Sequence, residues 1–281
     1  MKSKCVAVVH GAISIVNAVA TGFGSALGIS LRVKVEIAVE KGAGVSLQSG
    51  NTNSMIQNII DTVLSKDFIK KNHLNIIISS EIPIGVGLKS SSAVSCALSL
   101  ACNGLLRPNI VDRSVIDAAT DSSLIAKTTI TGAYDDSSAC YYGGLVVTDN
   151  FGRKVLRRDD CVDKIAAIIY IPRNSKRGDT SKLKLMADLY REAFKLASAG
   201  DYWKAMNLNG TLGSALLLAD YFPARLALEN GAIAVSVTGN GPAIAAVAKI
   251  ENINGIKSAL QALDGIVMVS HVNNEKAAIV G

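Results

Sequence analysis

The pattern of apolar and polar residues along the chain predicts alternating strands and helices. Residues 31–39 carry apolar side chains at every second position with charged residues between them, which predicts a half-exposed strand. Residues 74–78 form a short apolar run rich in branched side chains, which predicts a buried strand. Residues 53–68 repeat apolar side chains at helical spacing and predict a helix.

The rest of the chain also divides into predicted strands and helices. Two segments lack a periodic pattern of apolar residues. Further strands are predicted at residues 4–9, 145–148, 166–171, 233–237, 243–248, 266–271 and 277–280. Further helices are predicted at residues 93–106, 111–126, 182–197, 201–219, 223–230 and 253–263. Residues 11–28, rich in small side chains, are expected to form a loop or a loop with a short helix, and the charged residues 153–163 are expected to link two halves. The order of elements near the C-terminus is typical of an α+β layer of helices on an antiparallel sheet.

A glycine- and serine-rich segment, residues 83–93, lies between a predicted strand and a predicted helix. Its glycines let the backbone approach a ligand closely, and its serines can cap the helix. The free N–H groups and the dipole of a helix N-terminus attract anions, phosphate above all, and Lys89 adds a positive charge. The simpler alternative is an ordinary glycine turn before a capped helix. Because Leu88 precedes the lysine and no third glycine follows, neither a Walker A loop nor a dinucleotide fingerprint is present.

Composition narrows the classes of function. The chain is 49% apolar and only 5% aromatic, with a formal net charge of +6. This charge suits an anionic ligand, whereas the scarcity of aromatic side chains argues against nucleic acid as a partner. The five cysteines are scattered without a CxxC pair, as expected for buried thiols in the cytoplasm. Polar residues interrupt the apolar N-terminal stretch, so neither a signal peptide nor a membrane span is expected.

Two adjacent carboxylates, Asp135 and Asp136, follow a glycine in the middle of the chain. Most such pairs are solvated caps. An alcohol that attacks ATP, however, needs a carboxylate to orient or deprotonate it, so the pair is also a candidate catalytic group.

The glycine–serine segment resembles the phosphate loop of the GHMP small-molecule kinases, written P-x-x-x-G-L-x-S-S-A. The matching residues are Pro83, Gly87, Leu88, Ser90 and Ser91, while Ser92 is an additional serine and Lys89 stands where many members have a small residue. Two other segments resemble the outer motifs of this family as homoserine kinases carry them: Asn17 with residues 22–28, and residues 237–242. The lysine that mevalonate kinases have in the first motif is missing. With all three motifs in the family's order, the chain is identified as a member of the GHMP kinases.

This resemblance implies an α+β fold of two domains with ATP and Mg²⁺ between them. Residues 1–158 would form an N-terminal domain like domain 2 of ribosomal protein S5, and residues 159–281 a ferredoxin-like C-terminal domain. The residues implied to bind ATP are Pro83, Gly85, Val86, Gly87, Leu88, Lys89, Ser90, Ser91 and Ser92. Ser91 and Asp121 would ligate magnesium, and Asp136, seven residues before Gly143, would act on the acceptor hydroxyl, with Asp135 as the alternative. The residues implied to bind the acceptor are Ser14, Asn17, Gly239, Asn240 and Gly241.

The acceptor itself is suggested by residues 11–31, which resemble the archaeal-type shikimate kinases. The resemblance implies phosphorylation of the 3-hydroxyl of shikimate, a step of aromatic amino acid biosynthesis. A basic loop with Arg173 and Arg177 is either a solvated loop or a source of positive charge for the shikimate carboxylate. The Arg-x-x-Leu-Ile-Pro run of homoserine kinases is absent. The alternatives are a homoserine kinase, an isoprenoid-pathway kinase, and a non-enzymatic module that binds anions or RNA.

Overall fold

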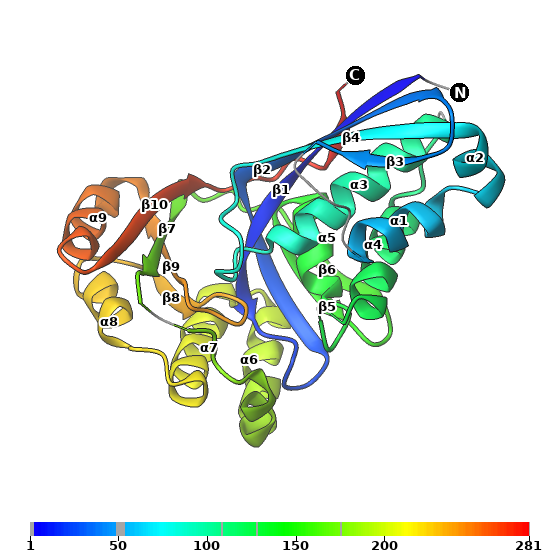
Figure 1. Cartoon of the computed structure of the whole chain (residues 1–281). Helices are drawn as coiled ribbons and strands as arrows, with labels where there is room; N and C mark the ends of the chain where they lie inside the picture. Colours follow the sequence, from blue (N-terminus) through cyan, green and yellow to red (C-terminus); the bar gives the residue numbers. More distant parts are fainter. Residues whose placement is uncertain (1–2, 49–53, 108, 128, 175, 281) are drawn as a thin grey trace.

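The computed structural model describes residues 3–48, 54–107, 109–127, 129–174 and 176–280, and these form two β-sheets with helices packed on them. Figure 1 shows the larger sheet with the helices of the first half of the chain on one side of the molecule, and the smaller sheet on the other side. Among the described residues, no helix is long and apolar enough to span a membrane. All five cysteines are buried, and they form no disulfide in this part of the chain.

The larger sheet has the strand order β11-β1-β2-β4-β3, with β5 added to the first half of β2 and β6 added to β5. Its strands are β1 (Lys4–Val16), β2 (Phe23–Lys41), β3 (Gly44–Leu47), β4 (Asn72–Ser80), β5 (Leu145–Asp149), β6 (Lys154–Asp159) and β11 (Ala278–Ile279). The helices of this half are α1 (Ser54–Val63), α2 (Lys66–Lys71), α3 (Ser90–Leu106), α4 (Asp112–Ile125) and α5 (Tyr134–Tyr142). Helices α3 and α5 both pack against β1 and β2, so they connect the sheet to the candidate carboxylates.

The expectation of a loop across residues 11–28 is wrong, because most of this segment lies in the long hairpin of β1 and β2. Only residues 17–22 form the turn between the two strands. The hairpin contacts α3 and α5, and it also contacts α6 (Ala187–Ala199) and α7 (Tyr202–Leu217). Strands enclosed by helices are buried on both faces, so they lack the polar–apolar alternation that a strand prediction relies on.

The charged segment at residues 153–163 is not simply a linker, since it contains strand β6, which pairs antiparallel with β5. The strand lies at the edge of the sheet and every residue in it keeps some exposure, which permits the charges that led to the linker prediction. The division at residues 158 and 159, which we keep as a proposal, falls at the end of this strand. Strand β11 at the C-terminus returns to pair with β1, so the chain ends on the larger sheet.

The smaller sheet is antiparallel, with the strand order β10-β7-β9-β8. Its strands are β7 (Ile165–Pro172), β8 (Ala234–Val237), β9 (Ile244–Lys249) and β10 (Gly265–His271), and helices α8 (Phe222–Glu229) and α9 (Ile253–Gln261) pack on them. The segment predicted to begin a helix at residue 182 starts instead as a 3₁₀ helix at Thr180–Met186 before α6. Helix α7 contacts both β8 and β1, so it joins the two sheets.

The phosphate-loop segment crosses the space between the two sheets and packs on the β8–β9 turn. Gly87 has a φ of +95°, and a Cβ at this position would overlap the carbonyl oxygen of Thr238. The Ala243 N–H donates to the Val86 carbonyl at 3.2 Å. The fold therefore brings the second and third motifs into direct contact.

Candidate active site

Helix α3 presents its N-terminus without a side-chain cap. Its N-cap residue is Lys89, and the Ala93 N–H donates to the Lys89 carbonyl, so the N–H groups of residues 90–92 precede the first intrahelical hydrogen bond. The serines lie in the first turn of the helix, which shows that the expectation of serine caps is wrong. Three uncapped N–H groups at the positive end of a helix dipole fit a phosphate group.

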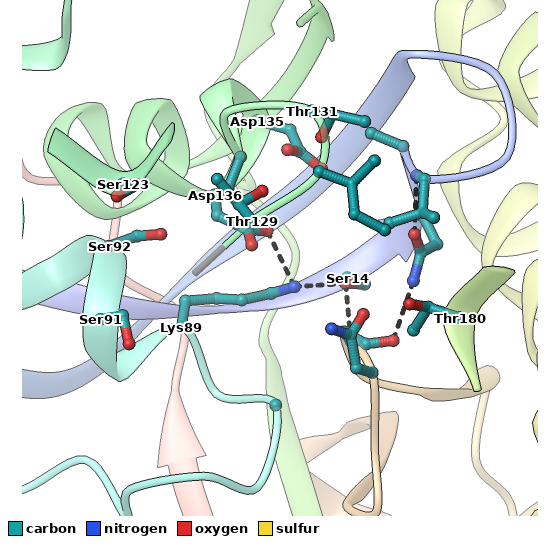
Figure 2. A pocket seen from close by; sticks show the side chains of 18 of the residues that line it. Ser14, Lys89, Ser91, Ser92, Ser123, Thr129, Thr131, Asp135, Asp136 and Thr180 are labelled. Carbon is teal, nitrogen blue, oxygen red and sulfur yellow. Dashed lines mark hydrogen bonds and ion pairs between the residues drawn. The ribbon is translucent and has the colours of Figure 1, made fainter. Parts of the chain in front are cut away.

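The side chain of Lys89 contacts a carboxylate and a hydroxyl. Its ammonium lies 2.8 Å from Asp136 Oδ1 and donates to Ser14 Oγ at 2.7 Å, and the side chain is only 5% exposed. Figure 2 shows both contacts as dashed lines from the lysine nitrogen. The backbone at Lys89 is left-handed, with a φ of +63°, which costs roughly 1–2 kcal/mol for a residue with a Cβ. A glycine would avoid this cost, so the side chain has a use that compensates for it.

Ser14 joins the three motifs into one hydrogen-bonded unit. Its Oγ accepts from Lys89 and from the Gly239 N–H at 2.9 Å, and its own N–H donates to Thr238 Oγ1 at 3.0 Å. The Thr238 hydroxyl donates in turn to the Gly87 carbonyl at 3.1 Å. Because both acceptor positions of the Ser14 hydroxyl are occupied, its hydrogen remains to be donated to a ligand.

Asn17 fixes the other side of the same turn. Its Nδ2 donates to the Gly239 carbonyl at 2.9 Å, and its N–H donates to Asn209 Oδ1 at 2.8 Å. Asn209 lies buried on α7 and donates to Ser236 Oγ at 2.7 Å. The sequence prediction missed Asn209, because Asn207, Thr211 and Ser214 lie in the same helix and nothing in the sequence sets Asn209 apart from them.

Asp135 and Asp136 lie in the first turn of α5, where the helix dipole favours carboxylates. The side chain of Asp136 is 18% exposed and pairs with Lys89. Asp135 is buried, and its Oδ1 accepts from Asn150 Nδ2 at 2.8 Å. Burial, with the nearby charge of Asp136 as the second cause, raises the pKa of Asp135 to about 7. The two neighbouring carboxyls therefore differ in exposure and in their partners.

These groups surround a cavity of about 320 Å³ (Figure 2). The sequence-predicted residues that line it are Ser14, Asn17, Gly85, Gly87, Leu88, Lys89, Ser90, Ser91, Ser92, Asp135, Asp136, Gly239 and Asn240. The lining residues that the sequence did not indicate include Ser123, Lys127, Thr129, Thr131 and Thr180. Two threonines close together before Gly132 were the available signal for part of this set. Arg177 also lines the cavity, and its Nε donates to the Gly85 carbonyl at 2.8 Å.

Some predicted residues lie outside this cavity. Pro83 and Val86 do not line it, and Gly241 lines a second cavity instead. The carboxylate of Asp121 forms an ion pair with Arg153 and does not reach the cavity, so the geometry gives no support to its predicted role as a magnesium ligand. Arg173 pairs with Asp264 on the surface at 3.2 Å. The described residues contain no cluster of three or more His, Cys, Asp or Glu that could hold a metal ion.

The second cavity is larger, at about 590 Å³, but its chemistry is different. Its walls are mainly apolar and come from the smaller sheet and from residues 216–223, while Lys176, Arg177 and Lys182 also line it. The two acidic residues that line it accept hydrogen bonds from backbone N–H groups two residues further along the chain. Asp179 accepts from the Ser181 N–H, and Asp220 accepts from the Phe222 N–H. The smaller cavity holds the paired lysine and carboxylate next to the helix N-terminus, so we assign the site there.

An uncapped helix N-terminus beside a carboxylate, in a cavity between two sheets, is an arrangement that suits an enzyme transferring a phosphoryl group to a hydroxyl. A family model described as the N-terminal domain of GHMP kinases matches residues 54–144. A shikimate kinase of Methanobrevibacter smithii is 34% identical over 96% of this chain and 97% of its own length. A shikimate kinase of Methanothermobacter thermautotrophicus is 35% identical over 94% of each chain. The chain belongs to the GHMP kinases, and within them to the group of these archaeal relatives.

Solved structures show the same fold. The homoserine kinase from Cytophaga hutchinsonii superposes with a TM-score of 0.77 at 18% identity, covering 100% of this chain and 98% of that one. The mevalonate kinase of L. major, in complex with R-mevalonate, gives a TM-score of 0.75 at 17% identity and covers 98% of both chains. The predicted α+β GHMP kinase fold is therefore confirmed.

Proposed function

We propose that the chain transfers the γ-phosphoryl group of ATP to the 3-hydroxyl of shikimate, giving ADP and shikimate 3-phosphate. The observation that carries the phosphoryl transfer is the Asp136–Lys89 pair at 2.8 Å in the cavity that also holds the uncapped N-terminus of α3. The choice of shikimate as acceptor is supported by the archaeal relatives. They are named shikimate kinases, and the similarity extends over nearly their whole length.

On the nucleotide side, the N–H groups of residues 90–92 would bind the phosphates of ATP. Magnesium would enter with the nucleotide, since this ion usually binds substrate phosphates with only one or two protein oxygens. The Ser91 hydroxyl is an oxygen donor on the cavity wall, and it fits such a site without Asp121. Bound in this way, the ion would neutralise charge on the phosphates during transfer.

On the acceptor side, Asp136 would orient the 3-hydroxyl and accept its proton. As the hydroxyl oxygen forms its bond to the γ-phosphorus, the bond from that phosphorus to the bridging oxygen breaks and ADP leaves. Lys89 fixes the direction of the carboxylate, and Ser14 has one hydroxyl hydrogen to donate. Of the arginines that the sequence offered for the shikimate carboxylate, Arg177 lines the cavity and Arg173 does not.

The proposal is tested by measuring ADP release from Mg-ATP with shikimate, homoserine and mevalonate offered separately. We expect turnover with shikimate alone. Turnover with homoserine or mevalonate instead would retain the mechanism and overturn the acceptor. If no acceptor is turned over and ATP does not bind, the chain would be a binding module, and its affinity for polyanions should fall steeply with salt.

We also propose that the chain acts in the cytoplasm, without a nucleic acid or membrane partner. The support is indirect: aromatic residues are few, and no described helix could span a membrane.

A further inference from the structure

Asp135 carries the carboxyl that the proposed mechanism does not use. This carboxyl occupies a space that a glycine on β2 leaves open. Gly24 on β2 has no side chain, and a Cβ at this position would overlap Asp135 Oδ2. A residue with any side chain at position 24 would therefore displace the carboxyl. The carboxyl of Asp135 can pack against β2 at this point because Gly24 has no side chain.

A buried amide, Asn150, fixes the orientation of this carboxyl. Its Nδ2 donates to Asp135 Oδ1 at 2.8 Å, and its Oδ1 accepts from the Asp135 N–H at 3.1 Å. The remaining bonds of the amide hold it in place, since Thr148 Oγ1 donates to it at 2.7 Å and Thr131 Oγ1 accepts from it at 3.2 Å. Asn150 itself is only 2% exposed. The carboxyl of Asp135 is thus held by a buried hydrogen-bond network.

Asn150 is the side chain that donates to the Asp135 carboxyl, at Oδ1, and the Asp136 N–H is a further hydrogen-bond donor to this carboxyl. The ammonium of Lys89 pairs with Asp136. Asp135 nevertheless lines the same cavity as Asp136. A buried carboxyl that is held in one orientation beside the candidate catalytic carboxylate is well placed to bind a polar group of the ligand.

The two carboxyls reach the cavity from different directions. Consecutive residues of an α-helix project about 100° apart, so Asp135 and Asp136 are not arranged to chelate one group. Two carboxyls that project in different directions into one cavity can each bind a different group of one ligand. With Asp136 on the hydroxyl that is phosphorylated, Asp135 can take a hydroxyl on the neighbouring carbon.

We propose that Asp135 binds the hydroxyl adjacent to the phosphorylated one, and that it thereby selects acceptors with two neighbouring hydroxyls over acceptors with one. This inference rests on the proposed function and makes it more specific. In shikimate the partner of Asp135 is the 4-hydroxyl, which is adjacent to the 3-hydroxyl. Homoserine has a single hydroxyl and would leave Asp135 without a ligand.

The test compares two enzymes with two acceptors. Wild type and Asp135→Asn are assayed with shikimate and with its analogue lacking the 4-hydroxyl, and kcat and KM are measured separately. For wild type, removal of the 4-hydroxyl should lower kcat/KM at least tenfold, because the buried carboxyl of Asp135 would be left without its hydrogen-bond partner. Asp135→Asn should lose a similar factor with shikimate, mainly through KM, and should lose little with the analogue.

A purely structural role of Asp135 predicts a different result, namely the same loss with both acceptors, and this result would overturn the inference. Asp136→Asn is the matched control, because it should lose kcat by a similar factor with both acceptors. If Asp135→Asn does not fold, wild type alone decides: equal kcat/KM for shikimate and the analogue overturns the inference. Absence of any turnover of shikimate by wild type would instead overturn the proposed function.

Discussion

At the scale of single residues, Lys89 shows how the site departs from the family pattern. The sequence placed it among the residues that bind phosphate, whereas the structure points its ammonium at Asp136 and Ser14. The two roles predict different kinetics. A lysine that binds phosphate contributes to the affinity for ATP, and a lysine that fixes the carboxylate contributes to the rate of transfer.

We therefore expect Lys89→Met to lower kcat with shikimate by about a hundredfold or more while KM for ATP changes by only a few-fold. The variant keeps a long unbranched side chain, one atom shorter than that of lysine, and removes its charge. Steady-state kinetics at saturating shikimate measure both constants. A large rise in KM for ATP with an unchanged kcat would assign Lys89 to the phosphates instead.

Asp135 predicts a dependence of stability on pH. Its pKa is raised from 3.8 to about 7, mainly by burial, so the folded state keeps the proton over a range in which the unfolded chain has lost it. The contribution of Asp135 to the free energy of unfolding is therefore largest below about pH 4, and it declines as the pH rises to about 7.

Asp135→Asn cannot titrate, so this decline should be absent from the variant. We expect the free energy of unfolding of the variant, relative to wild type, to increase between pH 4.5 and pH 8. Urea unfolding at both pH values measures the difference. A constant difference, or one that decreases over this range, would contradict the raised pKa.

At the scale of elements, the close contact between the phosphate loop and the β8–β9 turn depends on Gly87. Its positive φ and the overlap of a Cβ with the Thr238 carbonyl both exclude a side chain. The contact also positions the N-terminus of α3, because Gly87 lies three residues before Ser90. Loop, turn and helix therefore form one structural unit.

Gly87→Ala should weaken ATP binding at least tenfold and lower the free energy of unfolding by about 1–3 kcal/mol, since strain and overlap act together. Gly255→Ala on α9 is the control, because a Cβ there meets no atom within 4 Å. The control should keep ATP binding and be as stable as wild type or more stable, as alanine favours a helix. Nucleotide titration and urea unfolding test both variants, and equal effects would refute the role of the loop contact.

At the scale of the whole molecule, the cavity is shared by the two halves of the chain. Ser14, Lys89 and Asp136 come from elements of the larger sheet, whereas Arg177 and Gly239 come from segments of the smaller one. Helix α7 contacts strands of both sheets. A ligand in this cavity should therefore stabilise the molecule as a whole and not one half alone.

Mg-ATP at about a hundred times its dissociation constant should raise the free energy of unfolding by about 2.7 kcal/mol. Asp136→Asn should keep most of this increase while losing nearly all turnover, since the carboxylate acts mainly on the acceptor hydroxyl. Thermal unfolding with and without nucleotide measures the increase. Loss of the nucleotide effect in Asp136→Asn would place this residue on the nucleotide side of the site.

The sequence by itself determined the family, the phosphate loop and most of the helices and strands. Strand β4, helix α3 and the order of elements after residue 233 could be recognised because they are local patterns of apolar spacing and glycine–serine composition. The strands at residues 11–28 and β6 could not, because one is enclosed by helices and the other is a charged edge. In both cases the position of the strand in the tertiary structure removes the alternation of apolar and polar residues by which a strand is predicted.

Only the tertiary structure decided what each polar residue of the site does. Asp135 and Asp136 are neighbours with the same side chain, and their roles differ because Gly24 and Asn150 bury one while Lys89 pairs with the other. These partners lie between 15 and 111 positions away in sequence, as the residue numbers show. Burial, charge pairing and the direction of a side chain depend on such distant contacts, and a local sequence pattern does not contain them.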